Sequence, residues 1–288
     1  MKIDELLKEF DSLVVGPEDV DVLRKFVALA SVRGKFTEAK RSELVLGSKQ
    51  TPQELLLDLK SKKSQLRTNL RNVAIQDSGE RPFNIPDSWI WCQIADVGEV
   101  IGGGTPSTDE KRYFANAGAG IPWLTPSDVG SKEISKATRG RRDITSLGLS
   151  NSGSRLLPKG AVLYTSRAPI GNVSIAENDL TTNQGFKSVI PYLPSMNEYI
   201  ALYLFATREW VNVGSSGTTF KEISGKKLQA LPFPLPSLIE QEIIYKTFKD
   251  LWLALDSLEV SMTNVYKARR KTLTSITQSI LNDEISLE

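Results

Sequence analysis

Four cationic side chains stand close together in the middle of the chain, in the run KATRGRR at residues 136–142. Its glycine allows a close approach of the backbone, and Lys and Arg side chains in such a loop suit contacts with phosphate oxygens or with guanine. A solvated basic loop is the alternative interpretation. The run therefore predicts a nucleic-acid contact, and this prediction depends on whether other segments show side chains of the same kind.

Three further segments concentrate hydroxyl, amide and cationic side chains, and we expect them to be loops: residues 164–167, 181–184 and 214–221. Asn and Gln can bond adenine bidentately, Arg can bond guanine, and Ser, Thr and Lys suit phosphate oxygens. Polar turn chemistry explains each segment equally well when it is taken alone. The candidate DNA-contacting side chains are Thr105, Ser107, Lys136, Arg139, Arg141, Arg142, Thr165, Ser166, Arg167, Asn183, Gln184, Lys187, Ser216, Thr218, Thr219 and Lys221.

Other kinds of chemistry find less support. The run GGGTP at residues 102–106 lacks the later glycine of a dinucleotide fingerprint, and the chain contains no G-K-[S/T], so we interpret it as a flexible turn after a strand over residues 89–97. With no His in the chain, imidazole-based triads and His-ligated zinc are excluded. The single Cys92 excludes a disulfide framework and is predicted to be a small buried hydrophobe.

A metal-dependent nuclease is one alternative that the sequence leaves open. Asp87 followed by Asp109, Glu110 and Lys111 offers carboxylates for a hard cation and a lysine to polarise a phosphate. The pattern is short enough to arise often by chance, and Asp87 between a proline and a serine also fits a turn.

Composition and glycine usage predict the elements that must position these residues. The chain has 288 residues, with 36 Lys+Arg against 34 Asp+Glu and 40% hydrophobic residues, which is typical of a globular protein. Its glycines are sparse before residue 83 and absent after Gly225. We predict an N-terminal helical region at residues 1–82, a mixed α/β domain at 83–230 and a C-terminal helix within 231–288.

Apolar spacing supports the helical N-terminal region. A first apolar stripe covers residues 3–13, and a second begins with Val20, Leu23, Val27 and Ala30. The run TPQE at residues 51–54 is a capping box that predicts a third helix, extending to about residue 73. In the middle domain, apolar runs at residues 161–165 and 188–191 predict strands.

The C-terminal segment predicts one long helix. The run SLIE at residues 237–240 is a second capping box, and a helix from there to residue 283 would measure roughly 70 Å. Its apolar residues alternate at steps of four and three, as in a coiled-coil seam. The seam residues are Ile244, Phe248, Leu251, Leu255, Leu258, Met262 and Val265. Arg269 takes the next seam position, and Leu273, Ile276 and Ile280 resume after a stutter. We expect this helix to need a partner helix, the alternative being one helix of an ordinary bundle.

Short motifs follow one another in an order that resembles a known family. They are LR at 23–24, ASVRGK at 30–35, IPDSWIW at 85–91, GGTPS at 103–107, GIPWL at 120–124, SD at 127–128, LPKG at 157–160, SR at 166–167, IG at 170–171, TNQ at 182–184, LPSL at 235–238 and EQ at 240–241. Each is weak alone, but their shared order resembles the DNA specificity subunit of type I restriction-modification systems.

The resemblance implies a fold and a function. The expected fold class is α+β, with one mixed α/β target recognition domain flanked by N-terminal helices and a long C-terminal coiled-coil helix. The domain would read half of a split site in double-stranded DNA, and the helix would act as a spacer and as a dock for methyltransferase subunits. Full-length family members resemble two such units in tandem, so this chain looks half-sized. We expect it to pair with itself on an inverted-repeat site or with a second specificity chain.

The resemblance also places catalysis elsewhere. The chain has no Asn-Pro-Pro-Phe or Asn-Pro-Pro-Tyr motif for adenine methylation and no Walker loop. We expect no cofactor in this chain, whereas methyltransferase subunits, with or without restriction subunits, would use S-adenosylmethionine, ATP and magnesium. A coiled-coil assembly protein without DNA affinity is the second alternative. The charged N-terminus and the lack of an apolar run of about 18 residues predict a cytoplasmic protein with no membrane association.

Overall fold

The computed structural model describes residues 14–66, 79–167, 169–213 and 222–285. The chain forms two compact units, one made of residues 28–245 and the other of the segments up to residue 27 and from residue 246 onward. Two helices, α3 (Asp19–Val32) and α11 (Leu238–Ile285), each contribute to both units.

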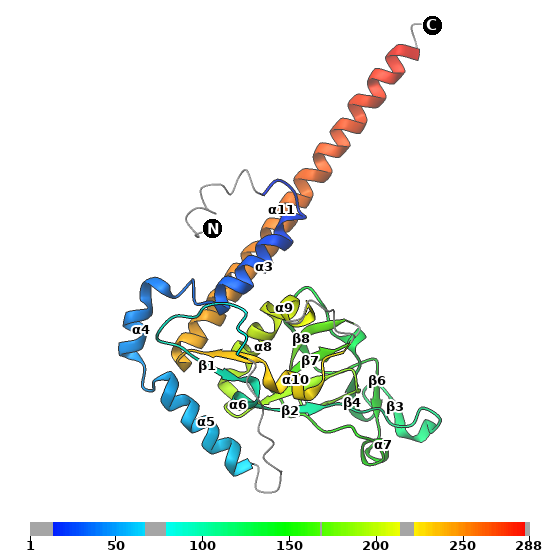
Figure 1. The fold of residues 1–288 in the computed structure, drawn as a ribbon. Helices are drawn as coiled ribbons and strands as arrows, with labels where there is room; N and C mark the ends of the chain where they lie inside the picture. The colour runs from blue at the N-terminus through cyan, green and yellow to red at the C-terminus, as the bar shows by residue number, and fades with distance from the viewer. Residues whose placement is uncertain (1–13, 67–78, 168, 214–221, 286–288) are drawn as a thin grey trace. The chain divides into compact units, whose positions relative to one another are not determined.

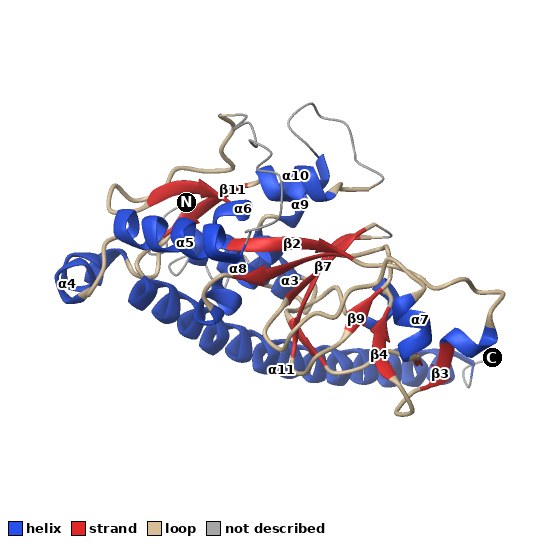
Figure 2. Cartoon of the chain, turned by 90° about the horizontal axis from the view of Figure 1, so that it is seen from below, coloured by secondary structure: helices blue, strands red, loops and turns tan. Residues whose placement is uncertain are grey.

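Three sheets build the larger unit (Figures 1 and 2). The five-stranded sheet has the order β2 (Gly98–Gly102), β10 (Lys187–Pro191), β7 (Val162–Ser166), β8 (Ile170–Ala176) and β5 (Ser135–Ala137). The four-stranded sheet has the order β3 (Phe114–Asn116), β6 (Arg142–Ile144), β4 (Ile121–Leu124) and β9 (Thr181–Thr182). The third sheet pairs β1 (Ile90–Gln93) with β11 (Pro232–Leu235). The β5–β8 and β4–β9 pairs are parallel and the others are antiparallel.

An apolar core links the two larger sheets. Leu163 of β7, Leu124 of β4 and Phe186 are fully buried within it. Its other members are Ile101, Val129, Ala137, Leu157, Ala161, Ala176 and Leu180. Helix α8 (Asn197–Ala206) packs on β7 and β8, and α9 (Arg208–Val213) packs on β8 (Figure 1). Strands β7 and β8 are therefore covered on both faces.

The remaining described helices connect these elements. In chain order they are η1 (Glu38–Lys40), α4 (Arg41–Gly47), α5 (Pro52–Leu66), α6 (Ile94–Val97), η2 (Lys111–Tyr113), η3 (Pro126–Asp128), α7 (Ser146–Ser150), η4 (Pro194–Met196) and α10 (Gly225–Ala230). The mixed α/β fold with a long C-terminal helix agrees with the predicted fold class.

Most of the predicted elements that fall on described residues are confirmed. Val20, Leu23, Val27 and Ala30 are buried on α3, and β7 and β10 match the two predicted strands. The capping box of α5 is present, with the Thr51 N–H donating to Glu54 at 2.8 Å and the Glu54 N–H donating to the Thr51 hydroxyl at 3.3 Å. The apolar stripe at residues 3–13 and the extension of α5 to residue 73 lie outside the described residues.

The strand predicted over residues 89–97 is wrong beyond Gln93. The Gln93 N–H donates to the Asp96 carboxylate at 3.0 Å, and the Gln93 side chain caps the same turn. This local box starts the single helical turn α6 and interrupts the strand. The preceding Cys92 is buried as predicted, and burial raises the pKa of its thiol well above the usual value.

Glu240 makes one half of its predicted capping box and uses its carboxylate elsewhere. The Glu240 N–H donates to the Ser237 hydroxyl at 3.4 Å, which is the first of the two bonds of a capping box. The carboxylate, however, accepts from the Thr37 hydroxyl at 2.7 Å, Arg41 Nε at 3.1 Å and Trp89 Nε1 at 2.8 Å. This buried acid joins the start of α11 to two earlier parts of the same unit.

In the smaller unit, α3 contributes a buried arginine to α11. Arg24 donates to Asp256 at 2.6 Å and to Glu259 at 2.7 Å, and its guanidinium lies 5.6 Å from the centre of the Trp252 ring. Burial alone would lower the pKa of Arg24, but its bonds to these carboxylates raise it overall. Helix α11 is 48 residues long, which corresponds to roughly 72 Å.

Candidate nucleic-acid interface

The glycine-rich turn after β2 is held by close packing. The N–H groups of Gly103 and Gly104 donate to the carbonyls of Phe186 and Thr182, and Trp123 Nε1 donates to the Gly104 carbonyl at 3.0 Å. A Cβ on Gly104 would lie 2.3 Å from the backbone of Gly153. The predicted turn is present, but its glycines serve close packing rather than flexibility. Because both N–H groups have partners, the turn does not offer them to a phosphate.

This turn places Thr105 beside the candidate Gln184. Gln184 follows shortly after β9, which lies beside β4 in Figure 2. The Thr105 hydroxyl donates to Gln184 Oε1, and Lys187 Nζ donates to the Gln184 carbonyl at 3.3 Å. Glu222 accepts ion pairs from Arg167 at 3.8 Å and from Lys187 at 3.6 Å. We call these five residues the Gln184 cluster. It carries two cations and one carboxylate, and the Gln184 side chain is exposed.

Two of the predicted DNA-contacting residues, Thr165 and Ser166, are buried rather than exposed. Thr165 and Ser166 belong to β7 and are fully buried, so the prediction that this segment is a loop is wrong. The Thr165 hydroxyl donates to the Pro169 carbonyl at 2.7 Å and accepts from the Asn172 N–H at 2.9 Å. In this conformation neither side chain is accessible to a duplex.

The segment at residues 181–184 is only partly a loop. Thr181 and Thr182 form β9 and are buried, because β9 pairs with β4 in the four-stranded sheet. Asn183 accepts the Gly185 N–H at 2.9 Å through its side-chain oxygen, which is turn chemistry. Gln184 therefore remains as the exposed amide of this segment.

The basic run at residues 136–142, which we call the arginine loop, is largely paired within the chain. The prediction of a loop is wrong at its two ends, because Lys136 belongs to β5 and Arg142 to β6. Lys136 forms an ion pair with Glu177 at 3.0 Å, which raises the pKa of Lys136. Arg139 forms an ion pair with Asp143, a fully buried carboxylate that also accepts the Gly118 and Gly120 N–H groups at 2.9 Å. These two cations have structural partners.

The other two cations of the arginine loop lie beside a small pocket. Arg142 stacks over Phe114 and Trp123, with its guanidinium carbon 4.0 Å and 5.0 Å from the ring centres. Arg141 is 82% exposed and lies 3.8 Å from Asp128. A pocket of about 220 Å³ is lined by Trp123, Thr125, Asp128, Arg141 and Arg142. Arg141 is therefore a highly accessible cation of the loop, with its carboxylate partner only at the limit of an ion pair.

The arginine loop and the Gln184 cluster are neighbours. A Cβ on Gly185 would lie 2.7 Å from Pro126 in η3, and one on Gly140 would lie 2.4 Å from the Trp123 carbonyl.

Sequence reasoning missed the partners Asp143, Glu222 and Trp123. No local pattern indicated these pairs, because the segment of Arg139 and Asp143 is not helical and the i,i+4 rule applies to helix faces.

Other predicted site residues are less informative. Ser107 is exposed in the turn after β2, and Ser216, Thr218, Thr219 and Lys221 lie outside the described residues. Lys111 begins η2 and is exposed.

Within the described part of the chain no three acidic, Cys or His side chains gather as metal ligands. No helix of that part is long and apolar enough to cross a membrane.

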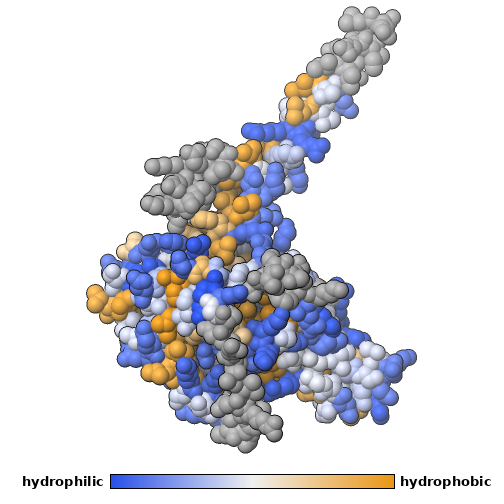
Figure 3. All heavy atoms as spheres, in the orientation of Figure 1, coloured by the Kyte–Doolittle hydropathy of each residue, from blue (hydrophilic) through white to orange (hydrophobic). Residues whose placement is uncertain are grey.

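The predicted seam of α11 changes character along its length. Ile244 and Phe248 are buried, whereas Leu251, Leu255, Leu258 and Met262 are half-buried. Figure 3 shows apolar side chains continuing along the helix, interrupted by a hydrophilic band that the sequence places at residues 267–271. The largely exposed apolar residues are Leu253, Val260, Val265, Tyr266, Leu273 and Ile276.

Comparisons with known proteins concern the family of the chain. A family model described as the type I restriction modification DNA specificity domain matches residues 86–261. The MjaIX specificity subunit of Methanocaldococcus jannaschii is 45% identical over 163 residues, which cover 56% of this chain and 37% of the relative. The EcoR124I/EcoR124II specificity subunit of Escherichia coli is 24% identical over 187 residues, which cover 63% of this chain and 45% of the relative.

Two solved structures have a similar fold. The HsdS subunit from Thermoanaerobacter tengcongensis matches with a TM-score of 0.50 and 18% identity, covering 90% of this chain and 52% of that one. A chain from a study of complex assembly in the type I R-M system matches with a TM-score of 0.52 and 19% identity, covering 82% and 53%. The chain thus spans about half the length, or less, of the proteins it matches.

Proposed function

Because the chain belongs to the family of the type I restriction modification DNA specificity domain, we propose that it recognises the DNA sequence for a type I restriction-modification complex. The observation that carries this proposal is the family match, which covers the recognition domain and continues into α11. The matched family is a specificity domain, so catalysis belongs to partner subunits.

The recognition surface that we propose combines the Gln184 cluster with Arg141. Exposed amide and guanidinium groups can bond base edges, and a long cationic side chain such as Arg141 suits a phosphate. The two lie on adjoining segments, so one stretch of duplex could meet both. Lys136 and Arg139 contribute less directly, because their partners hold them in place.

We further propose that α11 is the docking element for methyltransferase subunits. A long helix with exposed apolar residues offers the surface that another helix needs. Those subunits, with or without restriction subunits, would supply S-adenosylmethionine, ATP and magnesium. The family resemblance supports this assignment, and a cytoplasmic location fits it.

The same helix supports pairing with a second specificity chain, whether identical or different. Arg24 covers α11 near Trp252, but Leu273 and Ile276 further along remain largely exposed. If two identical chains pair there, twofold symmetry requires an inverted-repeat site with a gap set by the helices. Replacing Leu273 and Ile276 by Glu should then give monomers in light scattering, whereas Ser257→Glu and Ser261→Glu on α11 test the effect of added charge alone. An unchanged oligomer in the first variant contradicts pairing through these residues.

The proposal as a whole is tested by expressing the chain with a cognate type I methyltransferase subunit and sequencing the methylome. We expect one methylated split motif that is absent when the chain is omitted. Filter binding of the purified chain to a random duplex separates this function from that of an assembly protein without DNA affinity. A wild-type complex that assembles but methylates no motif contradicts the proposal. Metal-dependent cleavage by the chain alone would favour the nuclease instead.

A further inference from the structure

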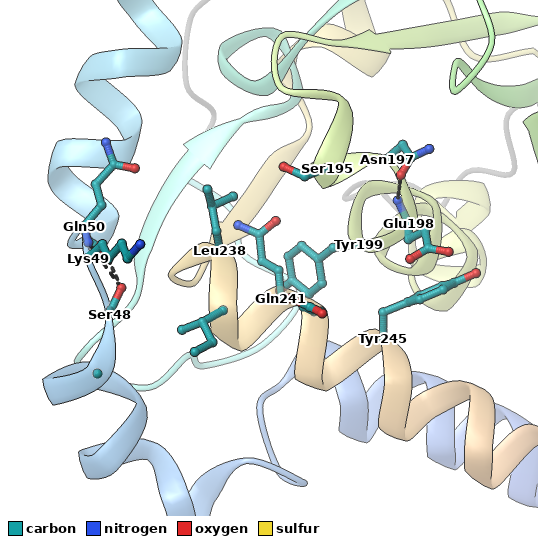
Figure 4. A pocket seen from close by; sticks show the side chains of 13 residues that line it. Ser48, Lys49, Gln50, Ser195, Asn197, Glu198, Tyr199, Leu238, Gln241 and Tyr245 are labelled. Carbon is teal, nitrogen blue, oxygen red and sulfur yellow. Dashed lines mark hydrogen bonds between the residues drawn. The ribbon is translucent and has the colours of Figure 1, made fainter.

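A pocket of about 680 Å³ lies in the larger unit, away from the candidate DNA contacts (Figure 4). Residues from three segments line it: 47–50 from the end of α4 to the residues before α5, 195–199 from η4 into α8, and 238–245 at the start of α11. A pocket of this size holds a drug-sized ligand or a large side chain with its neighbours.

Two buried side chains in the lining each carry one polar atom without a hydrogen-bond partner in the structure. Gln241 is 2% exposed and its Oε1 has no hydrogen bond, and Tyr199 is 1% exposed with an equally unpartnered hydroxyl. The Gln241 amide is oriented by its Nε2, which donates to the Pro236 carbonyl at 3.0 Å, so its oxygen is the free end. Figure 4 shows Gln241 extending from α11 into the space beside Ser195. A buried free acceptor of this kind favours a ligand that donates a hydrogen bond.

The charges of the lining favour a cation. Glu198 and Glu242 are exposed at the pocket and Lys49 is its one cationic residue, which leaves one net negative charge. The half-buried Tyr245 adds aromatic surface, on which a guanidinium can stack. Burial, with a contribution from the Glu198 carboxylate, raises the pKa of Tyr245 to about 12, which keeps its hydroxyl neutral.

We infer that this pocket binds an arginine side chain of the methyltransferase subunit that docks beside the start of α11. The guanidinium donates to Gln241 Oε1, and the carboxylates of Glu198 and Glu242 balance its charge. Arginine fits better than lysine because its planar group donates in several directions and stacks on tyrosine rings. The inference rests on the proposed function for the identity of the partner.

The first test uses the full-length chain and a small probe. N-acetyl-arginine amide is titrated into ¹⁵N-labelled protein, with N-acetyl-citrulline amide as an uncharged probe of the same shape. We expect the arginine probe alone to shift the Gln241 side-chain amide and the backbone amides of residues 238–245. The inference is overturned if neither probe shifts these signals or if both shift them equally.

Variants sharpen this titration. Glu198→Gln and Glu242→Gln should each weaken probe binding about two- to fivefold, as for an exposed ion pair. Gln241→Leu should weaken it about tenfold, because the probe then loses a hydrogen bond to its charged group. Lys49→Ala should strengthen binding about twofold, a gain that misfolding cannot produce. Glu133→Gln, an exposed acid outside the pocket, is the matched control and should change nothing.

The second test measures assembly with the methyltransferase subunit by calorimetry. The double variant Glu198→Gln with Glu242→Gln should weaken assembly at least about fivefold, while the residual complex methylates the wild-type motif. Unchanged assembly overturns the inference even when the probe binds, and would then assign the pocket to a small guanidinium compound. If the wild-type complex methylates no motif, the proposed function fails whatever the titration shows.

Discussion

The arginine loop and the Gln184 cluster contain similar side chains but use them differently. In the arginine loop, Arg139 pairs with the buried Asp143 and Arg142 stacks on Phe114 and Trp123. In the Gln184 cluster, the polar groups bond one another at the surface, and a single carboxylate, Glu222, is shared between two cations. The first group mainly holds the four-stranded sheet together, whereas the second leaves polar groups exposed.

The difference shows that a dense run of cations is not in itself a binding surface. A cation that neutralises a buried acid cannot leave that acid for a phosphate without a large desolvation cost. An exposed amide that is fixed at one end, as Gln184 is by Thr105, can bond a base with little loss of entropy. The two regions therefore predict different consequences when side chains are removed.

The largest effect is expected for Arg139→Ala. The substitution leaves Asp143 buried without its cationic partner, so the free energy of unfolding should fall by about 2–3 kcal/mol. Urea denaturation measures this loss, and Arg112→Ala, which removes an exposed pair with Glu110, is the control that should cost less than about 0.5 kcal/mol. A stable Arg139→Ala protein with weakened DNA binding would show instead that Arg139 serves the duplex.

An intermediate effect is expected for Gln184→Ala. If Gln184 reads a base, the variant should lose about 1–3 kcal/mol of discrimination at one base pair while its stability stays unchanged. Competition between duplexes with single substitutions measures the preference. Thr105→Val, which removes the hydroxyl that orients the Gln184 amide, should lose part of the same preference. Equal weakening on every duplex in both variants would show that Gln184 contacts the backbone.

Much of the fold could be predicted because its signals are local. Helix α11 follows from a start signal and a long stretch without glycine or proline, and α5 from the box formed by Thr51 and Glu54. The run after Trp89 was misread because Gln93 and Asp96 cap a helical turn within an otherwise strand-like sequence. The strand-like alternation and the helix-capping residues predict different structures for this segment. Packing in the folded protein decides between them, and packing cannot be read from the sequence.

The site could be predicted only in outline. Thr165 and Ser166 have the side chains of a polar loop, but β7 is an inner strand with α8 on one face and the core on the other. The stacking of Arg142 depends on β6 lying between β3 and β4, which brings together residues far apart in the sequence. Such long-range pairing decides which polar groups remain available, so residue types alone overestimate the interface.

The smallest effect is expected for Arg141→Ala, the substitution that tests whether any cation of the arginine loop is available to DNA. Arg141 is 82% exposed and its carboxylate partner Asp128 is 3.8 Å away, so its removal should leave stability within about 0.5 kcal/mol. If Arg141 meets a phosphate, binding should weaken alike on all duplexes, and the slope of log affinity against log salt should fall by about 0.9. Titrations at several salt concentrations, with Lys159→Ala as the exposed control, measure that slope. An unchanged slope would leave the whole arginine loop as a structural element and confine DNA contact to the Gln184 cluster and its neighbours.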